Sequence, residues 1–267
     1  MIYPILLLLL LSAPFATAQL GDISDDNTFE AKFDLQVRGG LSLPLGKYRL
    51  LTDISDDRSA AGIGAYSELL GSFTPLLSSP WRIGLTLGYM HHSFQSEASK
   101  IYFSLSKLEG SPWNSFYGLL GVHFTSHNKL YYSIGASVGV MGYSGGNITS
   151  ANIALDTMEV HTWTYGTNPV GAVQARLSVG YHFTPKFSMF VNISILYAAG
   201  LRKGNLLTER FVVNGQNIQQ QPPLDQKKSS VQNQTTIFAL NIGIGFRYKF
   251  YEEPEEFNYK FNIEENQ

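Results

Sequence analysis

The segment 237-IFALNIGIGFRYKF-250 carries the clearest structural signal of the chain, because apolar residues alternate strictly with small, polar or charged ones. The apolar positions begin at Phe238 and recur at every second residue as far as Phe250, with Asn241 and Arg247 among the residues between them. Successive side chains of a β-strand point to opposite faces. The segment therefore predicts a strand with one apolar and one polar face, as in a wall between lipid and a polar interior.

The same alternation recurs along the chain and predicts seven further strands. They cover residues 33–43, 63–73, 81–89, 115–125, 130–140, 173–183 and 187–197. The connections between strands alternate in length: 44–62, 95–114, 145–168 and 201–234 are long, and 77–80, 127–129 and 184–186 are short. Long extracellular loops and short periplasmic turns are the rule in bacterial outer-membrane barrels. We therefore predict an all-β fold, a transmembrane antiparallel up-and-down β-barrel of about eight strands over residues 31–250.

The strand number has one open alternative. Residues 101–107 alternate weakly and fit a ninth and tenth strand, but they also fit a helical turn that Gly110 and Pro112 would end. With an even number of strands, both termini lie in the periplasm.

The composition is poor in charge and rich in aromatic residues and glycine. Charged residues make up 15% of the chain, against about 25% in a typical soluble domain. The absence of cysteine excludes disulfides, thiolate catalysis and cysteine-ligated metals. The net charge of −2 gives no electrostatic basis for binding nucleic acid, so we expect no such partner.

The first 18 residues are typical of a cleavable signal peptide. An apolar run from Ile5 to Leu11 precedes the small-x-small pattern of Ala16 and Ala18. This run is too short to cross a hydrocarbon core of about 30 Å as a helix. No Lys or Arg precedes it, which leaves an uncleaved anchor as the alternative. Residues 19–30 are polar and predict a flexible lead-in.

The chain resembles small bacterial outer-membrane barrels of the OmpA/OmpX type and the OmpW-like type. The glycine-rich opening strand 37-VRGGLSLPLGKY-48 and the closing strand 237–250 carry the resemblance. It implies an integral outer-membrane protein in contact with outer-membrane lipid. It also implies that the barrel-assembly machinery reads Phe246, Tyr248 and Phe250 as its signal. Residues 251–267 continue past this signal and are interpreted as an acidic periplasmic tail, or alternatively as a periplasmic contact segment.

An eight-stranded barrel is only wide enough for side chains to fill its interior. The inward positions of the predicted strands carry many ionisable residues: Asp34, Arg38, Glu68, Arg82, His123, Arg176, His182, Arg247 and Lys249. Buried charges are costly unless they are paired. We therefore predict a structural charge network that plugs the lumen, with a gated or narrow conduit as the alternative.

The sequence offers no constellation for catalysis or metal binding. His91 and His92 are adjacent, so in a regular strand they face opposite sides and cannot share one metal ion. No spacing in the sequence combines a nucleophile with the acid–base candidates Asp156, Glu159 and His161 into a catalytic set. We expect no enzyme activity, no catalytic residue, no cofactor and no metal site.

Two functions fit these observations. The first is a structural, surface-binding or adhesion role, in which the long loops, carrying Trp113, Trp163 and Tyr165, meet a surface ligand. The second is an OmpW-like narrow route for small apolar solutes; a lipid-modifying barrel enzyme is less favoured. Charges through the middle of the lumen favour the first function, whereas an apolar upper cavity favours the second.

Overall fold

A computed structural model describes most of the predicted barrel. It covers residues 33–49, 60–74, 80–94, 108–126, 130–154, 157–166, 168–184, 186–212 and 222–250. The predicted signal peptide, lead-in and acidic tail lie outside these residues, as does the ambiguous segment 101–107.

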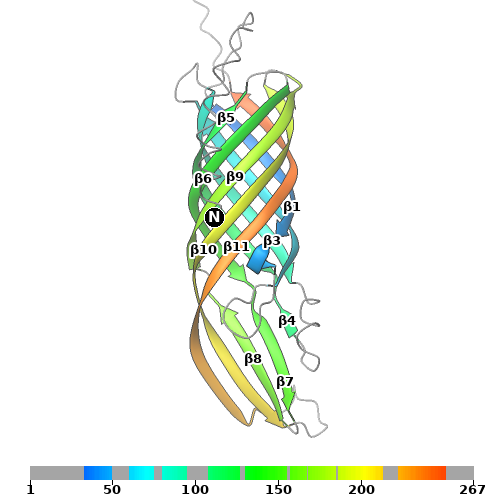
Figure 1. Ribbon diagram of the computed structural model, residues 1–267, viewed down its shortest axis with the longest axis vertical. Helices are drawn as coiled ribbons and strands as arrows, with labels where there is room; N and C mark the ends of the chain where they lie inside the picture. The colour runs from blue at the N-terminus through cyan, green and yellow to red at the C-terminus, as the bar shows by residue number, and fades with distance from the viewer. Residues whose placement is uncertain are drawn as a thin grey trace, which may run out of the picture. The chain divides into compact units, whose positions relative to one another are not determined.

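Eight antiparallel strands close into a barrel (Figure 1). They are β1 (Phe33–Pro44), β2 (Ala61–Phe73), β3 (Trp81–Phe94), β5 (Trp113–Thr125), β6 (Leu130–Gly145), β9 (Asn168–His182), β10 (Phe187–Val212) and β11 (Asp225–Phe250). The first strand pairs with the last from Phe33 opposite Phe250 to Pro44 opposite Ala239, which removes both free edges. The predicted all-β up-and-down barrel is confirmed, with eight strands in its wall.

The outer face of the barrel is apolar. Ile244 is 54% exposed, whereas Arg247, three residues further along β11, is only 1% exposed and lies inside. The same alternation leaves exposed Leu, Ile and Val side chains on every wall strand. Such a surface far exceeds the apolar patches that water-soluble proteins tolerate, and it matches the lipid-facing band of a membrane barrel.

Aromatic side chains gather where the short turns join the strands. Ring contacts link Phe33 with Phe250, and Phe124 with both Trp81 and Tyr132, at centroid distances of 5.3 to 5.8 Å. Rings of this kind mark the interface between hydrocarbon and water in outer-membrane barrels. They therefore set one boundary of the lipid-facing band.

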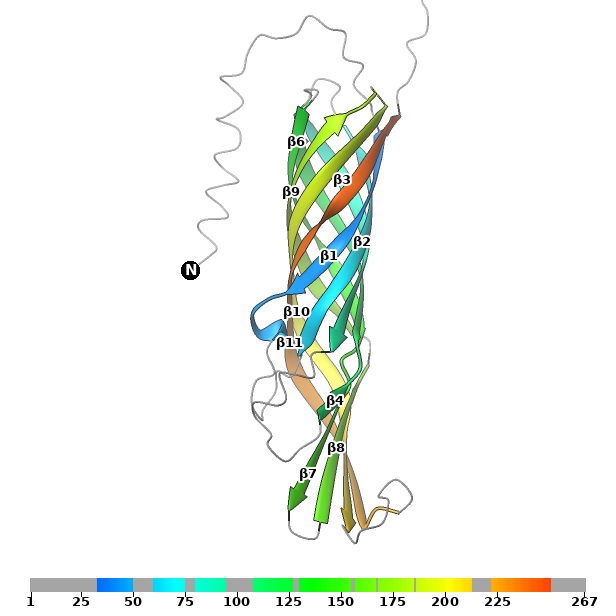
Figure 2. The same ribbon diagram turned by 90° about the vertical axis from the view of Figure 1, so that its right-hand side faces the viewer.

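The same sheet continues beyond the other end of the barrel (Figure 2). The strands β10 and β11 are each 26 residues long, whereas about 9 to 11 residues cross a membrane. The far part of β10 pairs with β8 (Thr157–Tyr165), β8 with β7 (Ile148–Ala154), and β7 with β4 (Leu108–Gly110). We call this five-stranded sheet, in the order β11-β10-β8-β7-β4, the external sheet.

The external sheet is built largely from the two longest predicted connections, 145–168 and 201–234. Both connections are largely strands, because pairing with one another satisfies backbone groups that a loop would leave to water. The turn η1 (Gly46–Tyr48) is a short 3-10 helix after β1. Within the described ranges, no helix is long and apolar enough to cross a membrane.

Candidate functional site: the barrel lumen

The layer of the lumen nearest the short turns is built around Asp34, which is fully buried on β1. One carboxylate oxygen, Oδ2, accepts hydrogen bonds from Arg82 on β3 at 2.5 Å and from Arg247 on β11 at 2.7 Å. The other oxygen accepts a bond from Gln36 at 3.0 Å. The guanidinium of Arg247 also lies 5.6 Å from the ring centre of Tyr131. A single carboxylate therefore ties three strands together across the lumen.

The middle layer is built around Glu68 on β2. Its Oε1 atom accepts hydrogen bonds from Tyr117 on β5 at 2.7 Å and from Gln174 on β9 at 2.6 Å. Its Oε2 atom lies 3.4 Å from Nε of Arg38 on β1. Arg38 also donates to Gln36 at 3.2 Å, which connects the middle layer to the Asp34 layer.

The seven charged residues expected in the central network are all buried. They are Asp34, Arg38, Glu68, Arg82, His123, Arg176 and Arg247. Two further predicted inward residues, His182 and Lys249, are only partly buried, because they lie at the end of the barrel beside the short turns. The network contains four guanidinium groups and two carboxylates, so cations are in surplus.

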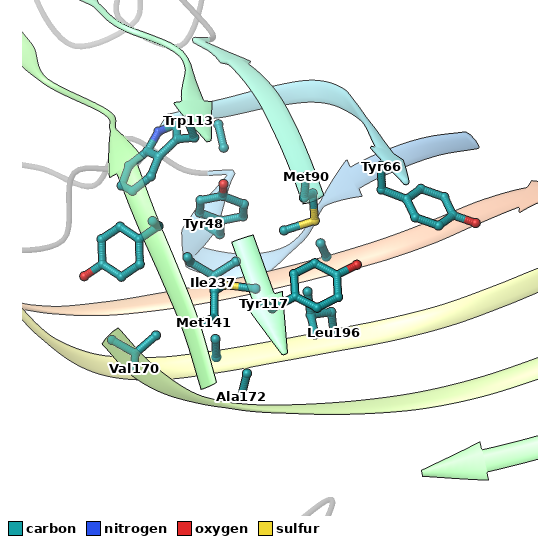
Figure 3. Close-up of a cluster of buried hydrophobic side chains, with 14 of the residues drawn as sticks. Tyr48, Tyr66, Met90, Trp113, Tyr117, Met141, Val170, Ala172, Leu196 and Ile237 are labelled. Carbon is teal, nitrogen blue, oxygen red and sulfur yellow. The ribbon is translucent and has the colours of Figure 1, made fainter. Parts of the chain in front are cut away.

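The end of the lumen toward the external sheet holds a cluster of buried apolar side chains. Every wall strand except β1 contributes to it: Ala61, Met90, Trp113, Met141, Val170, Leu196 and Ile237 are among its members. Tyr48 enters this cluster from η1, and its ring meets the ring of Trp113 at 5.5 Å in an edge-to-face contact. Figure 3 shows these side chains gathered around Tyr48. We call this cluster the apolar cap.

Sequence reasoning missed the apolar cap, although a signal for it exists. The inward positions of several strands change from polar to apolar toward the external sheet, as from Asn192 and Ser194 to Leu196 and Ala198 on β10. The insertion of Tyr48 has no such signal, because it depends on how the connection after β1 folds back.

A chain of hydrogen bonds crosses the apolar cap. The hydroxyl oxygen of Tyr48 lies 3.1 Å from Nδ1 of His92, and Nε2 of His92 lies 2.9 Å from the hydroxyl oxygen of Ser42. Ser42 in turn donates to Oδ1 of Asn241 at 2.6 Å. These bonds all run in one direction when His92 is neutral with its proton on Nε2. Tyr48 then donates to Nδ1 of His92, Nε2 donates to Ser42, and Ser42 donates to Asn241. The adjacent His91 faces away and contacts Asn114 at 2.9 Å, so the two histidines do lie on opposite faces.

The acid–base residues on the external sheet form a surface cluster. Arg210 on β10 donates to Glu159 on β8 at 2.7 Å, and this bond lowers the pKa of the Glu159 carboxyl. His161 lies 3.6 Å from Glu159 and 3.1 Å from the hydroxyl of Thr208. Asp156 lies outside the described residues. Among the residues that are described, no group of three His, Asp or Glu could hold a metal ion.

The aromatic residues expected to act as an assembly signal lie on the lipid-facing side of β11. Phe246, Tyr248 and Phe250 are each about half-exposed. Phe246 stacks on Phe187 of β10 at 5.8 Å, and Phe250 contacts Phe33 of β1 at 5.3 Å. These three side chains therefore lie along the seam where the last strand meets its two neighbours.

No protein-family model and no curated protein matches the chain. Among solved structures, it is similar to a major outer membrane protein from Thermus thermophilus, with 13% identity, 82% of this chain and 99% of that chain covered, and a TM-score of 0.47. It is also similar to OprG from Pseudomonas aeruginosa (10% identity, 84% and 100% covered, TM-score 0.44) and to Neisserial surface protein A (9%, 82% and 98%, 0.40). Because these sequence identities are so low, the fold is assigned from the strand pairing described above.

Proposed function

We propose that the chain is an integral protein of a bacterial outer membrane whose closed barrel presents the external sheet to a partner outside the cell. The observation that carries this proposal is the continuity of β10 and β11, which run unbroken from the lipid-facing band into the external sheet. Binding residues are often placed on segments that a rigid scaffold positions. Here the scaffold is the barrel, and its lumen contains charged layers below an apolar cap.

The strand registers supply a direct test of surface binding. One variant would join Tyr143 to Asn168, and Gly200 to Thr235, through two-residue Asn-Gly turns, because each pair lies opposite in neighbouring strands. The trimmed barrel should still fold, as judged by heat-modifiability on a gel. If the external sheet binds a partner, cells that carry the full chain should aggregate or adhere to matrix-coated surfaces, and cells that carry the trimmed barrel should do so less. Equal adherence by both forms would count against the proposal.

A closed lumen predicts a low ion conductance. The charged layers and the apolar cap leave side chains across the whole barrel, so a planar bilayer containing the protein should show no large, steady conductance. A stable pore of porin-like conductance would contradict the closed barrel.

The apolar cap supports a second candidate, a route for small apolar solutes. Buried charges at Asp34 and Glu68 oppose an apolar path straight through the barrel, so a solute would have to leave sideways through the wall. Vesicles containing the protein would then take up a labelled aromatic hydrocarbon faster than empty vesicles, and Met141→Lys in the cap would abolish the difference. Equal uptake by empty and loaded vesicles would reject this candidate.

The assembly role of the closing strand is part of the same proposal. Replacing Phe250 by Ala should lower the folded fraction in cells, because the barrel-assembly machinery would read the strand poorly. Refolding of the purified variant into detergent should be close to that of the unchanged chain, since Phe250 faces lipid. A parallel loss in both settings would indicate a purely structural role.

A further inference from the structure

The middle layer of the lumen holds more positive charge than its carboxylate can neutralise. Arg38 on β1 lies opposite Glu68 on β2 in the strand register. Arg176 on β9 is 9% exposed and faces the lumen two residues along from Gln174, which donates to Glu68. Two buried guanidinium groups therefore lie on the lumen face near a single carboxylate.

Glu68 already interacts with three side chains other than Arg176, and only its Oε2 atom accepts no hydrogen bond. Its Oε1 atom takes the bonds of Tyr117 and Gln174, and its Oε2 atom faces Arg38. Among the described residues, Arg176 forms no ion pair with a carboxylate, whereas Arg38 and Glu68 are paired. A buried cation that is not paired carries a large desolvation cost. Arg176 therefore requires a negative partner that Glu68 does not supply.

Several hydrogen-bond donors around Arg176 have no acceptor among the described residues. They include Nε and Nη1 of Arg176 itself and Nη1 of Arg38. The amide nitrogen of Asn192 and the hydroxyl of Ser137 are also unpartnered. Asn192 is on β10 and Ser137 is on β6, the two strands that pair with β9. Each lies two positions from the residue opposite Arg176, so its side chain faces the lumen, as that of Arg176 does. Two buried acceptors of the same layer, Oε2 of Glu68 and Oε1 of Gln174, also lack a hydrogen-bond partner, so the unpartnered donors still outnumber the unpartnered acceptors.

We propose that Arg38 and Arg176 form a binding site for a small monovalent inorganic anion of the chloride class. One such ion would neutralise the single surplus charge of the layer and accept bonds from the unpartnered donors. The narrow interior of an eight-stranded barrel favours a compact ion over a bulky one. This site goes beyond surface binding by the external sheet, and neither proposal depends on the other.

The test uses the full-length protein refolded in lipid vesicles and unfolded with urea, which adds no ions. Sodium chloride would replace sodium gluconate at constant ionic strength. Because an ion that binds only the folded state stabilises it, the unfolding constant should fall up to about tenfold for each tenfold rise in chloride above the dissociation constant. Arg176→Gln should abolish this dependence. Arg210→Gln, on the exposed external sheet, should retain it.

A charge variant and a direct readout complete the design. Glu68→Gln removes the competing carboxylate and should lower the chloride concentration needed for half of the effect. Crystals grown in bromide should show an anomalous peak beside the guanidinium of Arg176, a result that does not depend on any variant folding. The proposal is overturned if chloride stabilises Arg176→Gln as much as the unchanged chain, or if bromide crystals show no peak there.

Discussion

Asp34 shows how one buried carboxylate can organise a barrel interior. Its two oxygens receive bonds from Gln36, Arg82 and Arg247, which belong to three strands that are far apart in sequence. Each guanidinium is almost fully buried, so the carboxylate that they share offsets much of the cost of removing them from water. The carboxylate therefore favours one alignment of β1 with β3 and β11.

Removing the charge of Asp34 should destabilise the barrel strongly. In Asp34→Asn, Arg82 and Arg247 stay buried and lose the carboxylate that they share, which typically costs about 3–5 kcal/mol. Urea unfolding in lipid vesicles, followed by tryptophan fluorescence, would measure the loss. The control is Glu209→Gln on the exposed external sheet, where the change should stay within about 0.5 kcal/mol. Equal stability of the two variants would contradict the role given to Asp34.

A second expectation at this scale concerns the surface pair of Glu159 and Arg210. The hydrogen bond from Arg210 lowers the pKa of Glu159, so this contact is present above the unfolded pKa and is lost as the pH falls through the lower folded value. Arg210→Gln should return the pKa of Glu159 toward its ordinary value. Carboxyl carbon shifts in an NMR pH titration would measure the change. An unchanged titration would show that Arg210 does not set it.

The sequence alone identified most of the charged lumen residues, because the alternation in a strand assigns each residue to a face. Arg38, Glu68 and Arg176 were placed inside in this way, and all three are buried. The partners could not be predicted, since pairing across a barrel depends on how strands far apart in sequence are staggered. The apolar cap and the entry of Tyr48 were missed for the same reason.

At the scale of the strand, the closure of the barrel depends on a close approach of two glycines. Gly40 on β1 lies opposite Gly243 on β11. A Cβ atom on Gly243 would overlap the backbone oxygen of Gly39 and would lie 2.6 Å from the hydroxyl oxygen of Tyr66. Since backbone atoms cannot move aside without breaking the pairing, glycine is required at this seam.

Replacing Gly243 by Val should prevent the seam between β1 and β11 from closing. The folded band in a heat-modifiability gel should be lost or strongly reduced. Gly171→Val is the matched control, because a Cβ atom at this strand glycine of β9 would meet nothing within 4 Å. Gly171→Val should therefore fold normally. A folded band of equal strength for both variants would argue against the steric role of the seam.

The barrel strands could be predicted from the sequence and the external sheet could not, because the two parts lie in different environments. Inside the membrane, lipid on one side and a polar lumen on the other impose a strict two-residue alternation, as from Leu240 to Phe246. Beyond the membrane no lipid faces the strands, so segments such as 225–236 are polar apart from Val231 and lack the two-residue alternation. Their strands are specified by pairing with neighbours, as between Gly204 and Val231, which leaves little trace in one sequence.

At the scale of the whole molecule, the arrangement in the membrane follows from the two ends of the barrel. The short turns and the aromatic ring contacts lie at one end, and the external sheet continues from the other. In outer-membrane barrels the short turns face the periplasm. We therefore expect the external sheet to face the medium and the turn between β9 and β10 to face the periplasm.

Because the chain has no cysteine, single substitutions can test this orientation without background. Ser230→Cys places a thiol on the exposed part of β11 in the external sheet, and Lys186→Cys places one on the exposed turn between β9 and β10. A membrane-impermeant maleimide added to intact cells should label the thiol at 230 and not the thiol at 186. Permeabilising the outer membrane should make both react, which shows that both sites are accessible. Labelling only at 186 in intact cells would mean that the barrel is inserted the other way round, with the external sheet in the periplasm.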